Sequence, residues 1–259
     1  MSTRVHVKID AGIAEIRLDG PDKHNVLGIA GWRTLAEEFE TLTKNADVRC
    51  VTIRGVGGRA FSAGSDISAF EAQRTAPDDV KGYSDAIGTA LHAVWNCPHP
   101  TIAIVQGLCV GGGLEIVTCC DVRVCEASSR FGAPINRLGL TMSHTELDPL
   151  VRLIGAGAAL DLLLTGELVP AAGARRIGLV NRVVPDGEVR TRGRELAEQI
   201  AAGAPLVNRW HKKFIRRLED PTPLSDAERA EAHDAFQTDD YREGREAFVE
   251  KRKPTFTGE

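Results

Sequence analysis

Two glycine-rich segments are the first places where this sequence could do chemistry. They are 61–67 (FSAGSDI) and 106–115 (QGLCVGGGLE), and each follows a β-rich run and precedes a helical pattern. Glycines let the backbone approach a ligand and leave N–H groups pointing outward at a helix N-terminus. The second segment lacks the G-x-G-x-x-G spacing of a dinucleotide site, and neither has a phosphate-loop pattern. Together they could supply two converging N–H donors, as an oxyanion hole requires, or they could be tight turns between buried elements.

A single carboxylate, Glu115, lies inside the second glycine segment. The apolar residues Leu114, Ile116 and Val117 surround it in the sequence, which predicts that its helix is largely buried. Burial raises the pKa of a carboxyl group, and such a group suits a general acid or base. A glutamate that caps its own helix or pairs with an arginine is the structural alternative.

The elements that must position these residues are predicted to be repeated β/α units. Alternating apolar residues around a turn at 10–12 predict a β-hairpin. Helices are predicted at 31–45 and 79–95, with buried strands at 50–54, 101–105 and 121–125. Beyond residue 133 the pattern is mainly helical, over 146–165, 186–218 and on to 253, with one strand-like run at 179–184. We therefore expect an α/β chain that ends in helices.

Two segments carry a resemblance to a known family. AGSDI at 63–67 and GGGLEIVTCCD at 111–121 resemble the signature segments of the enoyl-CoA hydratase/isomerase (crotonase) family. The resemblance runs from Ile13 to the C-terminus, where 238–252 is similar to the family's closing segment. It implies a crotonase-like spiral of repeated β-β-α units with a helical C-terminal trimerisation region. We accordingly predict an acyl-CoA-binding core at 1–200 and a helical oligomerisation region at 201–259, in a homotrimer or a hexamer made of two trimers.

The resemblance also implies a ligand and roles for three residues. The ligand is an acyl-CoA thioester, whose coenzyme A is part of the substrate, so no separate cofactor is expected. The thioester oxygen would be held by the backbone N–H groups of Ser65 and Gly112, and Glu115 would match one of the family's two catalytic glutamates. Each well-placed N–H donor contributes about 3–4 kcal/mol to the stability of an enolate-like transition state.

Contacts to coenzyme A follow from the same resemblance. The predicted contacts are Lys23, His24, Ala63, Asp66, Ile67 and Lys251. Lys23, His24 and Arg59 flank the expected entrance to the site, where phosphates require cations, and Lys251 would reach the coenzyme A of a neighbouring subunit. For each cation, a solvated surface charge is the alternative interpretation.

The sequence departs from the family at one catalytic position. The segment 131–139 reads FGAPINRLG, and Ile135 stands where the hydratases carry their second glutamate. Hydration needs water to be oriented and deprotonated and a proton to be delivered to the α carbon, work that two carboxylates share. An isoleucine beside Glu115 would raise the glutamate pKa further, which favours proton delivery to an enolate over activation of water.

Nearby polar residues could compensate for this departure. Asn136 is expected to point away from the pocket if Ile135 faces it, because neighbouring side chains diverge. Ser143, His144 and Glu146 follow, and a histidine that titrates near neutrality is a plausible replacement. The favoured alternative is that His144 to Glu146 form the cap of the next helix.

Composition excludes several other classes of protein. The chain has 259 residues, 32 Lys+Arg, 36 Asp+Glu and a net charge of −4, so nonspecific binding to nucleic acid or to an anionic membrane is not expected. It has no run long and apolar enough to span a bilayer, and we expect no targeting segment. Its six cysteines lack metal-ligand spacing, so we expect free buried thiols, no metal and a cytoplasmic protein.

The segment 208–217 is basic with interleaved aromatic residues. Such a segment could suggest RNA binding, but Val207, Trp210, Phe214 and Leu218 recur at helical spacing. We therefore expect an amphipathic helix whose apolar side packs inward and whose cationic side faces solvent.

The sequence as a whole predicts an acyl-CoA-processing enzyme that stabilises a thioester enolate with one glutamate as acid and base. An acyl-CoA decarboxylase or lyase is the alternative reaction, because it needs the oxyanion hole and a single proton donor. A noncatalytic acyl-CoA-binding protein is the alternative of a different class, supported by Ile135 and opposed by the presence of Glu115.

Overall fold

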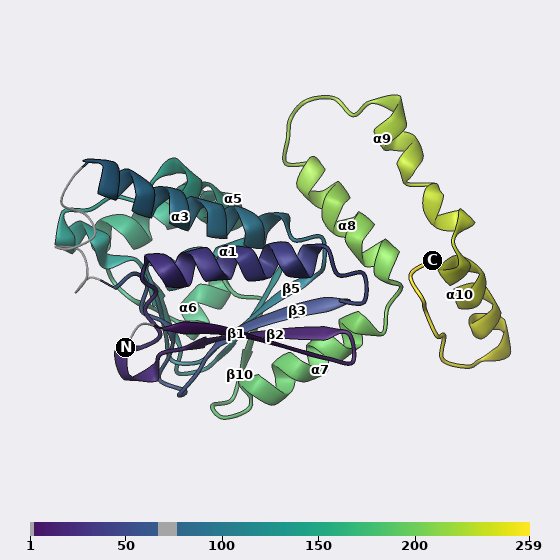
Figure 1. Ribbon diagram of the computed structural model, residues 1–259, viewed down its shortest axis with the longest axis horizontal. Helices are drawn as coiled ribbons and strands as arrows, with labels where there is room; N and C mark the ends of the chain where they lie inside the picture. The colour runs from purple at the N-terminus through teal and green to yellow at the C-terminus, as the bar shows by residue number, and fades with distance from the viewer. Residues whose placement is uncertain (1–2, 67–76) are drawn as a thin grey trace.

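A six-stranded sheet forms the centre of the molecule (Figure 1). The computed structural model describes residues 3–66 and 77–259. The strand order is β1 (Arg4–Asp10), β2 (Ile13–Asp19), β3 (Cys50–Gly55), β5 (Thr101–Val105), β7 (Val122–Glu126) and β10 (Arg182–Val184). The first two strands form the predicted hairpin, with Ala11 and Gly12 at positive φ in its turn, and all later pairs in this sheet are parallel.

A second sheet of four very short strands was not predicted. Its order is β4 (Ala60–Ser62), β6 (Leu108–Val110), β8 (Arg130–Gly132) and β9 (Val169–Pro170). Along the chain, β3 is followed by β4, β5 by β6 and β7 by β8, and a helix follows each pair. The main chain therefore repeats a β-β-α unit three times, which confirms the predicted spiral. The glycine-rich segments contain β4 and β6, so they are parts of the sheet as well as turns.

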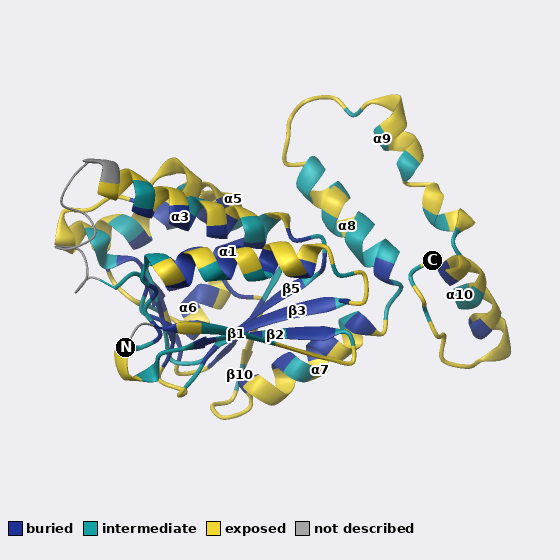
Figure 2. Ribbon diagram, viewed as in Figure 1, coloured by how far each residue is buried: buried dark blue, intermediate teal, exposed yellow. Residues whose placement is uncertain are grey.

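Helices cover both faces of the large sheet (Figure 2). They are α1 (Ile29–Thr43), α3 (Pro77–Asn96), α4 (Gly112–Cys119), α5 (His144–Thr165), α6 (Ala171–Arg176) and α7 (Val189–Ala201). Trp32, Leu35 and Phe39 lie on one face of α1 and are fully buried, as their spacing predicts. α7 covers the opposite face of the sheet, where Leu196 packs in a cluster with Ile104.

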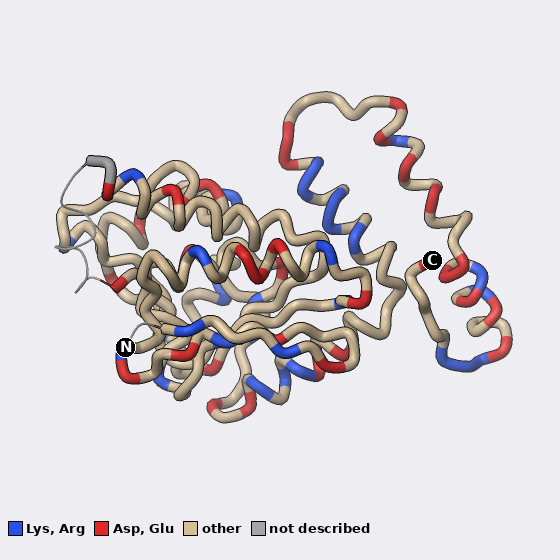
Figure 3. Tube along the Cα trace, in the orientation of Figure 1, with Lys and Arg blue, Asp and Glu red and all other residues tan. Residues whose placement is uncertain are grey.

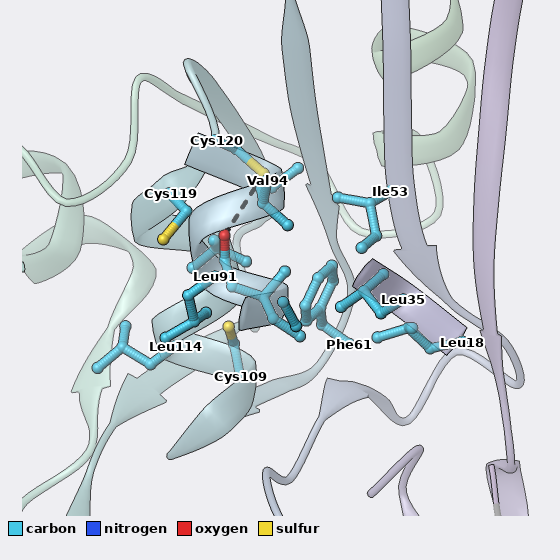
Figure 4. Packing of buried hydrophobic residues seen from close by; sticks show 14 of the residues in the cluster. Leu18, Leu35, Ile53, Phe61, Leu91, Val94, Cys109, Leu114, Cys119 and Cys120 are labelled. Carbon is cyan, nitrogen blue, oxygen red and sulfur yellow. Dashed lines mark hydrogen bonds between the residues drawn. The ribbon is translucent and has the colours of Figure 1, made fainter. Parts of the chain in front are cut away.

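All six cysteines are buried free thiols, as predicted. Figure 4 shows Cys109, Cys119 and Cys120 packed among the core residues around Leu91 and Phe61. The Cys120 thiol donates a hydrogen bond to the Ile116 carbonyl (3.5 Å). Within the described residues, no helix is both long enough and apolar enough to cross a membrane.

The last helices form an arm beside the α/β core (Figure 1). They are α8 (Pro205–Arg217), α9 (Asp226–Glu231) and α10 (Asp239–Glu250), with a 3₁₀ turn at Asp234–Gln237. α10 exposes two large apolar side chains, Phe248 and Val249, which are 85% and 75% exposed. Their exposure is compatible with the predicted subunit contacts of 201–259, and the boundary at residue 200 stays a prediction.

The prediction that the cationic side of α8 faces solvent is wrong. Asp121, at the start of β7, pairs with Lys212 (2.7 Å) and Arg216 (3.0 Å), and Arg209 donates to two backbone carbonyls of the core. In Figure 3 the Lys and Arg residues of α8 are drawn in blue. The basic residues turn inward because buried carbonyl groups and a carboxylate at the edge of the core require donors. Leu218, expected to pack inward, is 68% exposed.

Candidate active site

A cavity of about 150 Å³ lies where the two glycine-rich segments meet the N-termini of α4 and α5. It is lined by Ala63, Ser65, Ile87, Val110, Gly111, Gly112, Glu115, Pro134, Ile135, Leu138, Leu140, Thr141, Met142 and Glu146. Most of these side chains are apolar. Among the lining residues, which all belong to the described part of the chain, the two glutamates carry the ionisable groups. Such a site combines a mainly apolar wall with a few convergent polar groups, as small-molecule sites do.

Backbone hydrogen bonds fix the first glycine segment. The Leu27 N–H donates to the Gly64 carbonyl (2.8 Å), and the Asp66 N–H donates to the Leu27 carbonyl (3.0 Å), which leaves Ser65 bridged to Leu27. The buried hydroxyl of Tyr83 donates to the same Leu27 carbonyl (3.0 Å). The Ser65 peptide is therefore held between two hydrogen bonds and cannot easily change direction.

The second glycine segment approaches the first at Gly112. A Cβ atom placed on Gly64 would lie 2.9 Å from the Gly112 nitrogen, so the two peptides are in contact. Gly111, at φ 53°, caps α4, and its N–H donates to the Gly132 carbonyl (2.9 Å). Within the described residues, the N–H groups of Ser65 and Gly112 have no protein acceptor. The structure thus brings together the two predicted N–H donors at one cavity.

Glu115 lies in the first turn of α4 and lines the same cavity. It is 6% exposed, so its predicted burial is confirmed. Its N–H donates to the Gly111 carbonyl (3.0 Å), the first regular hydrogen bond of the helix. The three residues predicted to be catalytic therefore lie at one site, with donors and carboxylate contributed by two separate turns of the spiral.

Ile135 lines the cavity from a 3₁₀ turn at Pro134–Leu138 and is half-buried. Asn136 points away, as predicted, and its side-chain N–H donates to the Leu164 carbonyl (2.9 Å). Ser143 is the N-cap of α5, and its N–H donates to Glu146 Oε2, so the predicted helix cap is confirmed. His144 is exposed and does not line the cavity. Glu146 contributes to the cap and also lines the cavity. From the sequence alone, a helix cap and a role at the site were alternatives.

The residues predicted to bind coenzyme A are only partly gathered at the cavity. Ala63 lines it, while Lys23 and Asp66 form an ion pair with each other (3.1 Å). The predicted contact Ile67 lies outside the described residues. Half-buried His24 accepts a hydrogen bond at its carbonyl from the Ala63 N–H (2.9 Å), so it supports the first glycine segment through its backbone.

Lys251 lies far from the cavity in the same chain. It ends α10, on the arm, whereas the cavity lies at the start of α4 and α5 (Figure 1). Its predicted contact involves a neighbouring subunit and stays a prediction.

Sequence reasoning missed most of the apolar wall. Ile87 comes from α3, and Leu138, Leu140 and Met142 come from the irregular segment before α5. Ile87 follows a helical spacing that already indicated burial. Leu138 ends a short 3₁₀ turn and residues 139–142 form neither helix nor strand, so no periodicity in the sequence marks these positions as lining residues.

Comparisons with known proteins agree with this fold. Residues 8–259 match the family model described as enoyl-CoA hydratase/isomerase, and the chain belongs to this family. A crystal structure of an enoyl-CoA hydratase/carnithine racemase from Magnetospirillum magneticum has a TM-score of 0.96 and 44% sequence identity. The aligned region covers 98% of this chain and 96% of that chain.

Two curated relatives carry different activities in their names. An enoyl-CoA hydratase of Mycobacterium tuberculosis is 34% identical over 93% of this chain and 91% of that protein. A mitochondrial Delta(3,5)-Delta(2,4)-dienoyl-CoA isomerase of Dictyostelium discoideum is 28% identical over 94% of this chain and 87% of that protein. Membership of the family therefore indicates an acyl-CoA enzyme but does not distinguish hydration from isomerisation.

Proposed function

We propose that the protein processes an acyl-CoA thioester by stabilising its enolate, with Ser65 and Gly112 as oxyanion donors and Glu115 as the acid and base. The observation that carries the proposal is the meeting, at one cavity, of a buried glutamate and two N–H groups for which the described residues offer no acceptor. Negative charge on the thioester oxygen grows as the enolate forms. Donors fixed in advance stabilise that charge without having to reorganise during the reaction.

Glu115 would move a proton at the α carbon of the acyl group. When its carboxylate takes this proton, the C–H electron pair passes into the enolate, whose oxygen lies between the two N–H donors. The reverse transfer, from the carboxylic acid to the α carbon, restores the thioester carbonyl. The apolar wall around Ile135 and Met142 excludes bulk water from this step, which strengthens each polar interaction inside the cavity.

A decarboxylase or lyase remains the second candidate reaction. One observation favours it: Ile135 lines the cavity. The resemblance implies a second glutamate at this position in the hydratases. Loss of CO₂ from a malonyl-type thioester also yields an enolate, and a single proton donor then completes the reaction. A noncatalytic acyl-CoA-binding protein would have the same cavity without turnover.

The decisive experiment compares Glu115→Gln with a matched control. Enoyl, 3-hydroxyacyl and malonyl-type thioesters are incubated with each protein in D₂O, and mass spectrometry follows water addition or loss, CO₂ loss and deuterium at the α carbon. Glu126 is as buried as Glu115 (5% against 6%) but lies outside the cavity, so Glu126→Gln controls for the loss of a buried carboxylate.

We expect Glu115→Gln to lower turnover by about 10²–10⁴-fold with little change in coenzyme A binding, and Glu126→Gln to keep turnover. Equal turnover in wild type and Glu115→Gln would refute the assigned role. Binding without any turnover or exchange in the wild type would leave the acyl-CoA-binding protein as the explanation.

The assembly and the compartment belong to the same proposal. Exposed Phe248 and Val249 support a homotrimer, alone or paired as a hexamer, built through the arm. The cytoplasm stays the predicted compartment, although the Dictyostelium relative is named as mitochondrial.

A further inference from the structure

A second carboxylate, Glu146, lines the same cavity as Glu115. The two glutamates come from the first turns of different helices, α4 and α5, which pack against each other. Every other lining residue, all of them described, is apolar or carries only a hydroxyl or backbone groups. The cavity therefore contains two carboxylates, although Ile135 stands where the resemblance implies a second glutamate in the hydratases.

The cap of α5 positions the Glu146 side chain. The Ser143 N–H donates to Oε2, while within the described residues Oε1 accepts no hydrogen bond from the protein. One oxygen is thus anchored and the other remains available to a small molecule. Glu146 is half-buried, whereas Glu115 is 6% exposed, so Glu146 is the carboxylate that water can reach more easily.

A role in helix capping does not by itself explain the location of Glu146. Glu228 makes the same hydrogen bond with the Ser225 N–H (2.7 Å) at the start of α9, far from any part of this cavity. Capping therefore requires only the serine and the glutamate. At α5, by contrast, the capping glutamate also lines a cavity, which contains two N–H donors and a buried glutamate.

We propose that Glu146 is the second acid–base group of this site and that the reaction is the reversible addition of water to a 2-enoyl thioester. This inference rests on the proposed enolate function. Glu146 takes a proton from water as the water oxygen bonds to C3. The π electrons then pass to the thioester oxygen, and protonated Glu115 delivers its proton to C2. Proton return through solvent from Glu146 to Glu115 completes the addition of one H₂O.

The test compares Glu146→Gln, Glu228→Gln and Glu115→Gln. Glutamine keeps an oxygen that accepts from the Ser143 N–H, so Glu146→Gln preserves the cap and removes only the acid–base group. Glu228→Gln is the matched control, because it changes the same kind of cap and also weakens an ion pair with Arg217. For each protein, kcat and KM for hydration of a short-chain 2-enoyl-CoA, α-deuterium exchange of a saturated acyl-CoA, and Tm are measured.

We expect Glu146→Gln to lower kcat for hydration by about 10²–10⁴-fold, with a much smaller effect on KM, on Tm and on deuterium exchange. Glu228→Gln is expected to lower Tm and to keep the wild-type kcat. Glu115→Gln is expected to lose both hydration and exchange.

Each other outcome overturns the inference. Wild-type hydration in Glu146→Gln, or equal losses of kcat and Tm in Glu146→Gln and Glu228→Gln, would leave Glu146 with a structural role only. Loss of both activities in Glu115→Gln together with normal hydration in Glu146→Gln would refute this inference and preserve the enolate function. Absence of hydration by the wild type would refute water addition, and exchange that depends on Glu115 would then still support the proposed function.

Discussion

Gly112 is the position where a single methyl group should disturb both folding and catalysis. A Cβ atom on this residue would lie 2.6 Å from Cζ2 of Trp32, a fully buried residue of α1. Carbon atoms in contact prefer about 3.5–4.0 Å. Either the indole or the start of α4 must therefore shift by about 1 Å in Gly112→Ala.

The size of the two effects follows from this shift. Overpacking of a dense core costs about 1–3 kcal/mol, so the free energy of unfolding should fall by that amount. The Gly112 N–H remains in the variant, but it moves relative to the Ser65 N–H. Because misplacement of reacting groups by about 1 Å can cost about 100-fold in rate, we expect a loss of kcat of that order.

A double-mutant cycle with Trp32→Phe tests the cause directly. Phenylalanine lacks the outer indole atoms that would meet the new methyl group, so it should relieve part of the strain. We expect the double variant to be more stable than the sum of the single effects predicts, by about 1 kcal/mol. Urea unfolding gives the stabilities, and turnover of an active thioester from the substrate panel gives the rates.

The control substitution is Gly82→Ala in α3, where a Cβ atom would meet nothing within 4 Å. Alanine in an open helical position should raise stability by about 0.5–1 kcal/mol and keep turnover. Wild-type stability and rate in Gly112→Ala would refute the packing argument. Strict additivity in the cycle would show that Trp32 is not the group that resists the methyl.

Two further predictions concern titratable groups outside the site. Burial lowers the pKa of His99 to about 4, and its Nε2 contacts the Leu42 carbonyl (2.9 Å). Since the unfolded chain binds this proton near pH 6.5, stability should fall as pH drops from about 6.5 to 4, by about 2 kcal/mol after allowance for screening. Urea midpoints against pH measure this loss, and His99→Gln should abolish its share. Burial also raises the pKa of the thiols, to about 12 for Cys50 and Cys120. A disulfide reagent at pH 8 should therefore modify none of the six cysteines until the protein unfolds. Fast reaction of the native protein would contradict their burial.

The large sheet could be predicted from the sequence and the small one could not. β3, β5 and β7 are runs of five or six residues with buried apolar side chains, long enough for their composition to identify them. The strands of the second sheet have two or three residues each, too few to show an alternating pattern. β4, β6 and β8 form because each follows a long strand and pairs in parallel with its equivalent in the neighbouring turn of the spiral, and β9 adds to β8 antiparallel, so the second sheet is a tertiary effect.

The orientation of α8 could not be predicted from the sequence pattern either. Trp210 and Phe214 recur at helical spacing, and a helix with one apolar side normally turns that side inward. Lys212 and Arg216 instead turn toward the core because Asp121 lies at its edge, with the Arg216 guanidinium 3.5 Å above the Trp95 ring. The periodicity of one segment contains no information about a carboxylate that lies far away in the chain.

The candidate site, too, could be predicted only in part from the sequence. Ser65, Gly112 and Glu115 could be located because a resemblance transfers roles position by position, and the structure brings all three to one cavity. The same resemblance predicts a second glutamate at the position where this chain has Ile135. It could not identify a carboxylate supplied from another position, because no motif connects Ile135 with Glu146.

The structure makes that connection through the segment between these two residues. Gly139 adopts φ 67° at the end of the 3₁₀ turn, and the Leu140 N–H donates back to the Ile135 carbonyl (3.1 Å). The chain therefore folds back on itself, and α5 begins beside the cavity that Ile135 has just lined. A carboxylate in the first turn of α5 consequently reaches the same cavity as one at residue 135, from a different direction. Under the proposed role of Glu146, a carboxylate from α5 therefore does the work that the resemblance assigns to residue 135, and only the folded structure shows that both positions line one cavity.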